Sequence, residues 1–269
     1  MKKSLGLFLL VAVGLLAACG GNKSEANSDR VIKVASQTSP MTDVVKKAAE
    51  VAKKDGWDIQ LVEVNDNIQY NELLNNHEVD ANFAQHAPYM EKFNEEKDGN
   101  LVAIQKIYDA KVGFYAKDYQ DVADLPEGAT IALPNDVSNE GRALAILNEA
   151  GLIQLKDGVG FNGTLKDIVA NPKNFQWLSV DLLNLAEAYN EKNVAMVYNY
   201  PTYIAKVGLK PADAILLEKE IDDRFAISLV AREDNQDSEK IKELKKAMTS
   251  SEVKKFLTEE HSDTLVPSF

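Results

Sequence analysis

Two polar stretches of the sequence combine the side chains that a small-molecule binding site needs. The first covers residues 134–142 and reads Pro-Asn-Asp-Val-Ser-Asn-Glu-Gly-Arg. Asn139 and Arg142 are three residues apart, so on a helix they share one face near its first turn. That face continues as an apolar one, where a buried arginine needs an anionic partner. The partner is either a ligand carboxylate held by the fork of Arg142 or an internal Asp or Glu, and the spacing alone favours neither.

The second polar stretch covers residues 80–89 and reads Asp-Ala-Asn-Phe-Ala-Gln-His-Ala-Pro-Tyr. It has the pattern of a strand that ends and turns into a helix, with proline in the first helical turn. His86 and Tyr89 fall on one helical face, and Gln85 and Asn82 add amide donors and acceptors beside them. These groups suit recognition of a polar ligand. The alternative is a helix-capping cluster with a structural histidine.

Neither catalytic nor metal chemistry is indicated by the sequence. The three histidines, His77, His86 and His261, show no metal-ligand spacing, and the chain has a single cysteine. The sequence contains no Gly-x-Ser-x-Gly elbow, no phosphate-binding glycine-rich loop and no His-Glu-x-x-His motif. We therefore predict a protein that is not an enzyme and that needs no cofactor and no metal.

The elements that must position these stretches alternate between short β-rich runs and helical patterns. Strands are expected at 31–35, 58–64, 102–108, 111–117, 130–133, 175–180, 194–197 and 225–231, and helices at 41–54, between 136 and 150, at 181–190 and twice near the end of the chain. This alternation predicts an α/β fold with largely parallel sheets. In such sheets ligands bind at the carboxyl ends of strands, where helix N-termini present free N–H groups.

A restart of the pattern predicts two lobes rather than one. Leu-Pro-Glu-Gly at 125–128 follows a strand, and a second strand–helix series then begins at Ala129. The chain is expected to cross between lobes near 112–119 and to return near 222–224. Lobe 1 would comprise residues 31–112 and 222–269, and lobe 2 residues 113–221. The alternative is one continuous sheet.

The N-terminus has the pattern of a lipoprotein signal peptide at residues 1–18. A basic start precedes an apolar run that is too short to span a bilayer, and Leu-Ala-Ala then leads into Cys19. Cys19 is expected to become the lipidated N-terminus of the mature chain. Residues 19–30 are polar and glycine-led, which predicts a flexible tether. We expect the protein on the extracytoplasmic face of the cell membrane.

The charge balance narrows the possible partners. Removing residues 1–18 takes away Lys2 and Lys3 but no acidic residue, so the formal charge changes from −12 to −14. So acidic a chain is not suited to bind nucleic acid, and it is not attracted to anionic lipid, which makes a lipid anchor the sensible attachment. With one cysteine no internal disulfide can form, so an ordinary core must stabilise the fold.

Five motifs in this order resemble those of the methionine-binding lipoproteins of bacterial ABC importers, the NlpA group. The motifs are Asp80-x-Asn82-x-x-Gln85-His86, Pro134-Asn135-Asp136-x-x-Asn139-x-x-Arg142-Ala143-Leu144, Gly151-Leu152-Ile153, Asp167-Ile168-x-x-Asn171-Pro172-Lys173 and Gly208-Leu209. The likeness runs through nearly all of the mature chain. It implies a two-lobed fold of the periplasmic-binding-protein type, with a ligand cleft between lobes. It also implies a monomer that delivers an amino-acid-like ligand to an ABC permease.

The same resemblance implies roles for particular residues. Arg142 and Asn139 would hold the carboxylate of the ligand, and His86 and Tyr89 would line the pocket. The asparagine that binds the ligand amino group in this family is best matched by Asn199. The part of the site that recognises the amino-acid backbone is therefore kept.

The part of the site that faces the ligand side chain departs from the family pattern. Asn67 stands where the family has a tyrosine, and Ala84 stands where it has an aromatic residue before Gln-His. Both changes make the wall more polar or more open, so L-methionine is expected to bind more weakly than is usual or not to be the best ligand. A methionine-containing dipeptide or another amino acid would fit better. The alternative is that Tyr70, Phe83 or Tyr115 rebuilds the aromatic slot.

These inferences predict a lipid-anchored extracytoplasmic substrate-binding protein that takes up methionine, a related amino acid or a short peptide. Two other classes stay open at this point. One is an enzyme on the same two-lobed fold, because a fold does not determine a function. The other is a surface adhesion or sensing lipoprotein without a role in transport.

Overall fold

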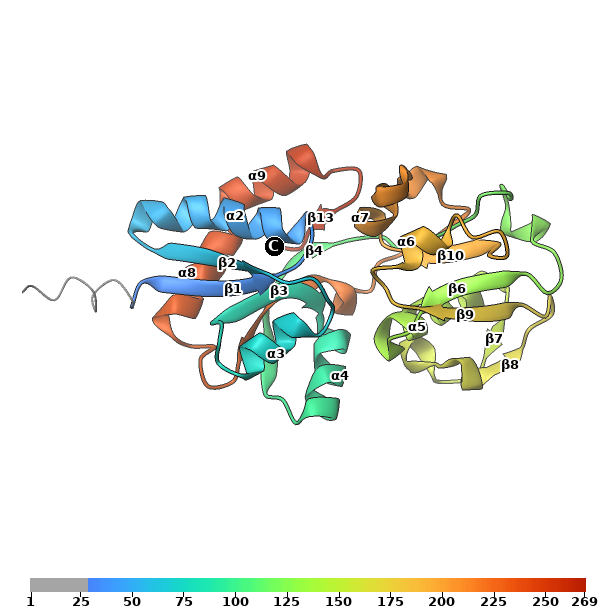
Figure 1. Cartoon of the computed structure of the whole chain (residues 1–269), viewed down its shortest axis with the longest axis horizontal. Helices are drawn as coiled ribbons and strands as arrows, with labels where there is room; N and C mark the ends of the chain where they lie inside the picture. Colours follow the sequence, from blue (N-terminus) through green and yellow to red (C-terminus); the bar gives the residue numbers. More distant parts are fainter. Residues whose placement is uncertain (1–28) are drawn as a thin grey trace, which may run out of the picture.

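The structure, a computed structural model, describes residues 29–269, which form two lobes joined by two chain crossings (Figure 1). The predicted signal peptide at 1–18 and Cys19 lie outside the described residues. Of the predicted tether at 19–30, only the last two residues are described. They form a turn in which the Arg30 guanidinium lies over the ring of Trp57.

The first lobe is built on a six-stranded sheet. Its elements are β1 (Val31–Ser36), α2 (Met41–Ala52), η1 (Lys53–Asp55), β2 (Asp58–Glu63), α3 (Gln69–Asn75), β3 (Ala81–His86), α4 (Ala87–Lys97), β4 (Leu101–Asp109), η7 (Asp223–Phe225), β12 (Ile227–Arg232), α8 (Glu239–Met248), α9 (Ser251–Glu260) and β13 (Val266–Pro267). The strand order is β13-β4-β12-β3-β1-β2. Strand β1 pairs in parallel with β2 and β3, whereas β12 runs antiparallel to β3 and β4.

The second lobe is built on a five-stranded sheet with a small two-stranded ribbon. Its elements are β5 (Gly113–Tyr115), η2 (Val122–Asp124), β6 (Thr130–Pro134), α5 (Val137–Glu149), β7 (Gln154–Leu155), η3 (Gly160–Asn162), η4 (Leu165–Asp167), β8 (Ile168–Ala170), β9 (Gln176–Val180), α6 (Leu185–Ala188), β10 (Met196–Asn199), α7 (Pro201–Ile204), η5 (Ala205–Val207), η6 (Pro211–Asp213) and β11 (Leu216–Leu217). The strand order is β11-β5-β10-β6-β9, and β7 pairs with β8. Strand β6 is parallel to β9 and β10, and β5 is antiparallel to β10 and β11.

The predicted two-lobed α/β fold is confirmed, but the expectation of largely parallel sheets is wrong. Strand β3 ends at His86 beside the second lobe, and β12 begins there with Ile227, which pairs with His86. Because the chain returns from the second lobe at this point, β12 must run in the direction opposite to β3. The outgoing crossing lies at 110–112, earlier than the predicted 112–119 and sharing only residue 112 with it, because Gly113 already pairs in the second sheet.

A predicted helix is present in the structure where one whole side of it is buried. Helix α2 buries Val44, Val45 and Ala48 completely, as its spacing predicts. The helix expected over 181–190 is wrong in length, because the described helix α6 has only four residues. The Asp181 carboxylate accepts the N–H of Leu183 at 2.9 Å, so this segment begins as a turn.

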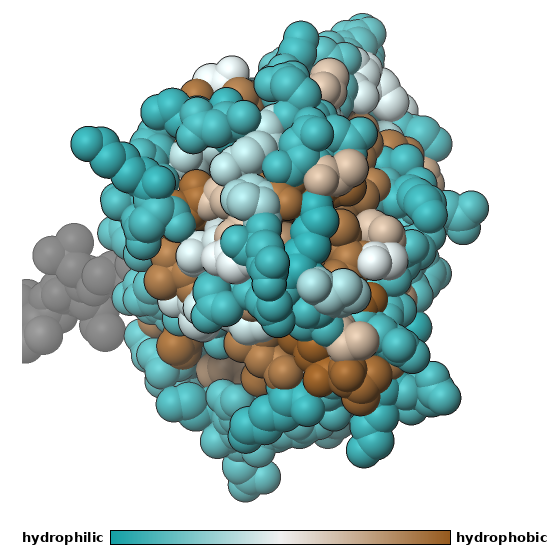
Figure 2. All heavy atoms as spheres, turned by 90° about the vertical axis from the view of Figure 1, so that its right-hand side faces the viewer, coloured by the Kyte–Doolittle hydropathy of each residue, from teal (hydrophilic) through white to brown (hydrophobic). Residues whose placement is uncertain are grey.

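The exposed face of the second lobe is mainly hydrophilic (Figure 2). Figure 2 views the molecule from the end of the second lobe and shows hydrophilic side chains over most of that face, with apolar ones gathered toward its lower part. Few large apolar side chains in the described chain are exposed, and Val169 on β8, with 60% of its surface exposed, is one of them. Between residues 29 and 269, no helix has the length and apolar character required to cross a membrane.

Candidate functional site

A cavity lies between the two lobes, and both lobes contribute to its wall. Its empty volume is about 480 Å³, including its mouth. The first lobe and the outgoing crossing supply Gln37, Met41, Asn67, Tyr70, Ala84, Gln85, His86, Tyr89, Tyr108, Ala110 and Ile227, and the second lobe supplies Asn139, Leu182, Tyr200, Thr202 and Tyr203. The cavity therefore lies at the carboxyl ends of β1, β3 and β10 and at the start of α5, where open α/β sheets bind their ligands.

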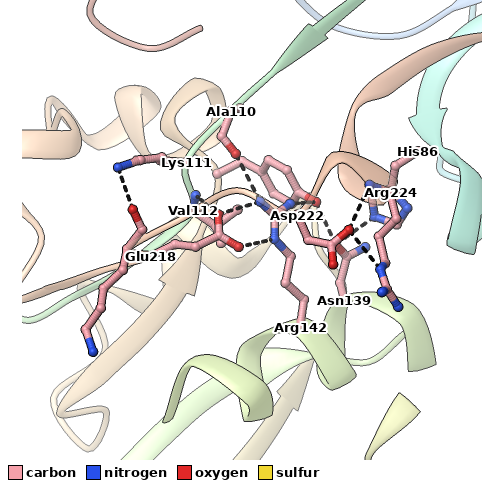
Figure 3. A network of polar contacts seen from close by, with 11 residues as sticks. His86, Ala110, Lys111, Val112, Asn139, Arg142, Glu218, Asp222 and Arg224 are labelled. Atoms are coloured by element: carbon pink, nitrogen blue, oxygen red, sulfur yellow. Dashed lines mark hydrogen bonds and ion pairs between the residues drawn. The ribbon is translucent and has the colours of Figure 1, made fainter. Parts of the chain in front are cut away.

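Helix α5 presents Asn139 to this cavity in a fixed orientation. Asp136 is the N-cap of the helix, and its carboxylate accepts the backbone N–H of Asn139 at 2.9 Å. The Asn139 side-chain Nδ2 also donates to both Asp136 oxygens, at 3.1 and 3.0 Å. Its Oδ1 is therefore turned away from the cap and accepts a hydrogen bond from the Tyr200 hydroxyl at 2.8 Å (Figure 3).

Close packing against α5 fixes the position of this helix start. Gly141 is followed on the helix by Arg142, and a Cβ at Gly141 would lie 2.1 Å from the carbonyl oxygen of Phe161. Only glycine allows this approach. The segment around Phe161 thus holds the N-terminal turn of α5 in place from outside.

Gly141→Ala is expected to lower the free energy of unfolding by roughly 1–3 kcal/mol, because the added methyl group collides with backbone. The sign of this change is informative, because replacing glycine by alanine in an unobstructed helix interior raises the free energy of unfolding by about 0.5–1 kcal/mol. Urea denaturation measures it. Glu149→Ala on the exposed face of α5 is the control and should stay within about 0.5 kcal/mol of wild type. A stabilised Gly141→Ala protein would contradict the packing argument.

His86 joins the two lobes directly at the cavity wall. It is the N-cap of α4, and its Nδ1 accepts the backbone N–H of Tyr89 at 3.2 Å. A nitrogen that accepts a hydrogen bond carries no proton, so the neutral ring carries its proton on Nε2. That N–H lies 3.2 Å from the Oδ1 of Asn139 in the second lobe and donates to it.

The surroundings of His86 keep its ring neutral. Burial removes the hydration of a protonated ring, and the nearby positive charge of Arg142 acts in the same direction, so the pKa of His86 falls to about 4. The Asn139 amide oxygen and the Asp136 carboxylate oppose this shift without cancelling it. The contact between the lobes is thus a hydrogen bond between neutral groups at physiological pH.

Arg142 is fully buried and is held by protein groups (Figure 3). Its Nε and Nη2 donate to the two carboxylate oxygens of Glu218, at 2.9 and 2.6 Å. Nη2 also donates to the Ala110 carbonyl, and Nη1 donates to the Tyr200 hydroxyl, both at 3.1 Å. These bonds use four of the five guanidinium N–H donors and leave one hydrogen on Nη1.

This arrangement bears on the open question about the partner of Arg142. An internal carboxylate is present, since Glu218 is only 3% exposed and follows β11 at the return crossing. Arg142 also contacts the outgoing crossing through Ala110. The guanidinium does not itself line the cavity, but Nη1 is bonded to the hydroxyl of Tyr200, whose side chain does.

Five of the eight predicted ligand-binding residues lie in the cavity wall: Asn67, Gln85, His86, Tyr89 and Asn139. Asn82 does not line the cavity. Its amide is buried on β3 and bonded to Asn71 at 2.8 Å, which ties β3 to α3. Asn199 does not line the cavity either; its Oδ1 accepts the N–H of Tyr200, and its buried Nδ2 has no hydrogen-bond partner within residues 29–269.

Sequence reasoning missed several wall residues that carry polar groups. Tyr200 and Tyr203 lie together at the start of α7, far along the chain from Gln37, and none of the three belongs to a motif noted in the sequence. The cavity wall contains five tyrosines, Tyr70, Tyr89, Tyr108, Tyr200 and Tyr203. Of the residues considered for rebuilding an aromatic slot, Tyr70 is in the wall, whereas Phe83 and Tyr115 are buried elsewhere.

The wall carries no ionised side chain. It contains no Asp, Glu, Lys or Arg. Burial raises the pKa of each of the five tyrosines, so all are neutral near pH 7, as is His86. In the described part of the chain, no cluster of His, Cys, Asp and Glu has the arrangement of a metal site. The cavity is therefore chemically suited to a small ligand without net charge.

Comparisons with known proteins show which family the chain and its fold resemble. A family model described as NlpA lipoprotein matches residues 32–269. The methionine-binding lipoprotein MetQ of Bacillus subtilis (strain 168) is 36% identical, over 99% of each chain. A solved YaeC-family lipoprotein from Enterococcus faecalis V583 is 51% identical with a TM-score of 0.81, covering 89% of this chain and 100% of that one.

A second solved relative holds a ligand. A nutrient binding protein from Burkholderia cenocepacia, bound to methionine, is 34% identical with a TM-score of 0.84, and the match covers 88% of this chain and 100% of that one. The family model spans nearly the whole described chain, and the sequence motifs, the fold and these relatives agree. The chain belongs to the NlpA lipoprotein family.

Proposed function

We propose that this protein is a lipid-anchored substrate-binding protein that captures an amino acid or short peptide in the interlobe cavity and presents it to an ABC permease. One observation carries the proposal: the cavity wall is assembled from both lobes and is bridged at its edge by the hydrogen bond between His86 and Asn139. A ligand placed there contacts both lobes, so binding favours the closed arrangement. The names of the relatives from B. subtilis and B. cenocepacia make methionine the reference ligand.

The polar groups of the wall suit the two ends of an amino acid. Arg142 is the cation nearest to the cavity, and its remaining N–H lies on Nη1 beside the Tyr200 hydroxyl, so a ligand carboxylate is placed at this end. To donate to that carboxylate, the Tyr200 hydroxyl would turn away from the Asn139 Oδ1 that it bonds in the structure. His86 and Tyr89 would complete this end. Asn67 and Gln85 would face other parts of the ligand.

Native mass spectrometry of protein purified without unfolding tests ligand capture. The expected spectrum shows the mass of the protein plus a single small molecule with the mass of an amino acid or short peptide, released on activation. A co-purified ligand of another class, such as a sugar, would overturn the proposal.

The membrane anchor is tested at Cys19. Cys19→Ala is expected to remove the protein from the lipid-anchored membrane fraction and to leave uncleaved precursor or soluble protein, because the thiol that would accept the lipid is gone. Metabolic labelling with a fatty acid, followed by fractionation, gives the readout. Ser24→Ala in the predicted tether is the matched control and should label like wild type. Wild-type labelling of the Cys19 variant would refute lipidation at this residue.

A further inference from the structure

One polar group in the cavity wall has no partner in the protein. Gln37 follows β1 and is 3% exposed. Its Nε2 donates to the Asn67 Oδ1 at 2.8 Å and to the Tyr203 hydroxyl at 3.3 Å. Its Oε1 is buried, and no donor in residues 29–269 reaches it. Buried acceptors in folded proteins are nearly always bonded, so this oxygen calls for a donor from the cavity, which water supplies in the free protein and a ligand supplies when it displaces that water.

Asn67 offers the complementary group beside Gln37. Its Oδ1 is engaged by Gln37, whereas no acceptor within the described chain is hydrogen-bonded to its Nδ2. The segment around Asn67 is held in place because its carbonyl oxygen accepts the Tyr89 hydroxyl at 2.9 Å. Two adjacent amides thus offer one acceptor and one donor at the same part of the cavity.

The neighbouring wall excludes a charged ligand group at this position. Inside the cavity the polar neighbours of the two amides are the neutral hydroxyls of Tyr203 and Tyr89, and no charged side chain lines it. Charged residues close by, such as Asp66 and Lys92, line the adjoining outer groove instead. A buried charge without a counter-ion is strongly disfavoured. A thioether or hydrocarbon has no donor and would leave the oxygen of Gln37 without a partner.

Resting on the proposed function, we infer that Gln37 and Asn67 form a subsite for a neutral carboxamide or peptide group on the ligand. The N–H of that group donates to Gln37 Oε1, and its carbonyl oxygen accepts from Asn67 Nδ2. The free amino acid that best fits this chemistry is L-glutamine, whose side chain is close in size to that of L-methionine. A dipeptide supplies the same group through its peptide bond.

Isothermal titration calorimetry with refolded, ligand-free protein tests the subsite. The probes are L-glutamine, L-methionine, L-glutamate and the dipeptide L-alanylglycine. Glutamine or the dipeptide is expected to bind at least about tenfold more tightly than methionine, since methionine leaves a buried acceptor unpaired. Glutamate is expected to bind more weakly than glutamine. Whichever of glutamine and alanylglycine binds more tightly identifies the source of the amide group.

Gln37→Met tests the residue with little change in volume. It should weaken glutamine binding by about 10- to 100-fold and leave methionine binding within threefold or improve it. Met41→Leu, also in the wall, is the control and should change both affinities equally. Thermal melting of the unliganded variants shows whether each is folded.

Two results would overturn the subsite while leaving amino-acid binding intact. One is that the wild type binds methionine as tightly as glutamine and the dipeptide, or more tightly. The other is that Gln37→Met loses affinity for glutamine and for methionine by the same factor. Binding of none of the four probes would overturn the subsite, whereas the proposed function is overturned separately, by a co-purified ligand of another class in the native mass spectrum.

Discussion

Arg142→Ala is expected to weaken ligand binding by about 30- to 1,000-fold, which corresponds to roughly 2–4 kcal/mol. The ligand carboxylate would approach Tyr200 and Asn139, and the last free N–H of the guanidinium lies on Nη1, next to the Tyr200 hydroxyl. Nε and Nη2 are paired with Glu218, so the part of the guanidinium that acts on the ligand is the Nη1 side, at short range in a buried place where screening by water is small.

Arg142→Ala alone also destabilises the fold, so a second variant is needed to separate the effect on binding from the effect on stability. Without Arg142, the carboxylate of Glu218 stays buried with no cation, and breaking such a pair costs roughly 3–5 kcal/mol of stability. Replacing both Arg142 and Glu218 by glutamine removes the two charges together. This double variant is expected to fold and still to bind at least about 30-fold more weakly than wild type.

Arg232 provides a matched control for a buried arginine outside the cavity. It is 7% exposed and donates to the carbonyls of Leu74 and Val79 within the first lobe. Arg232→Gln should lower the melting temperature and leave ligand affinity within about threefold. If the folded double variant at 142 and 218 binds its ligand as tightly as wild type, then Arg142 serves only to join the two chain crossings.

Ligand affinity is expected to fall about tenfold between pH 7.5 and pH 5.5 because of His86. In the closed form the pKa of His86 is about 4, whereas a hydrated histidine in an open cleft has its ordinary value near 6.5. Because the closed form binds fewer protons between these values, closure is fully favourable above pH 6.5. It becomes less favourable as the pH falls toward 4, by about 1.4 kcal/mol per pH unit.

Calorimetric titrations across this pH range measure the slope, and His86→Asn is the matched variant. Asparagine retains a side-chain acceptor for the N–H of Tyr89 at the start of α4 but does not titrate. Its affinity, whatever its absolute value, should be nearly independent of pH between 5.5 and 7.5. A slope in this variant equal to that of wild type would show that another group causes the pH dependence.

The parts of the site that were predictable from sequence are those governed by local rules. Asp136 follows a predicted strand and is of a residue type that caps helices, and in the structure it is the N-cap that holds Asn139 at the start of α5. His86 and Tyr89 stand at a strand-to-helix junction whose proline marked the helix start. Both junctions lie in the wall of one cavity because strands β3 and β6 each end facing the other lobe.

The rest depends on contacts between distant parts of the chain. Glu218 lies 76 residues after Arg142, and no local pattern marks it as the partner among many surface carboxylates. Gln37 lies 166 residues before Tyr203, and an isolated amide after a strand has no distinguishing spacing. The direction of β12 likewise follows from where the chain returns between the lobes rather than from its own residues.

The central claim is that the interlobe cavity binds an amino-acid-like ligand. A bulky substitution that fills the cavity tests this claim most directly. Thr202, in the second lobe, lines the cavity, and Thr202→Trp places an indole in the ligand volume. Refolded wild-type protein and this variant are titrated by calorimetry against the amino acids and short peptides. We predict one-to-one binding of at least one of them by wild type with a Kd below about 10 µM, or about 7 kcal/mol, and no measurable binding by a folded Thr202→Trp protein. Undiminished binding in this variant would place the ligand elsewhere and contradict the account.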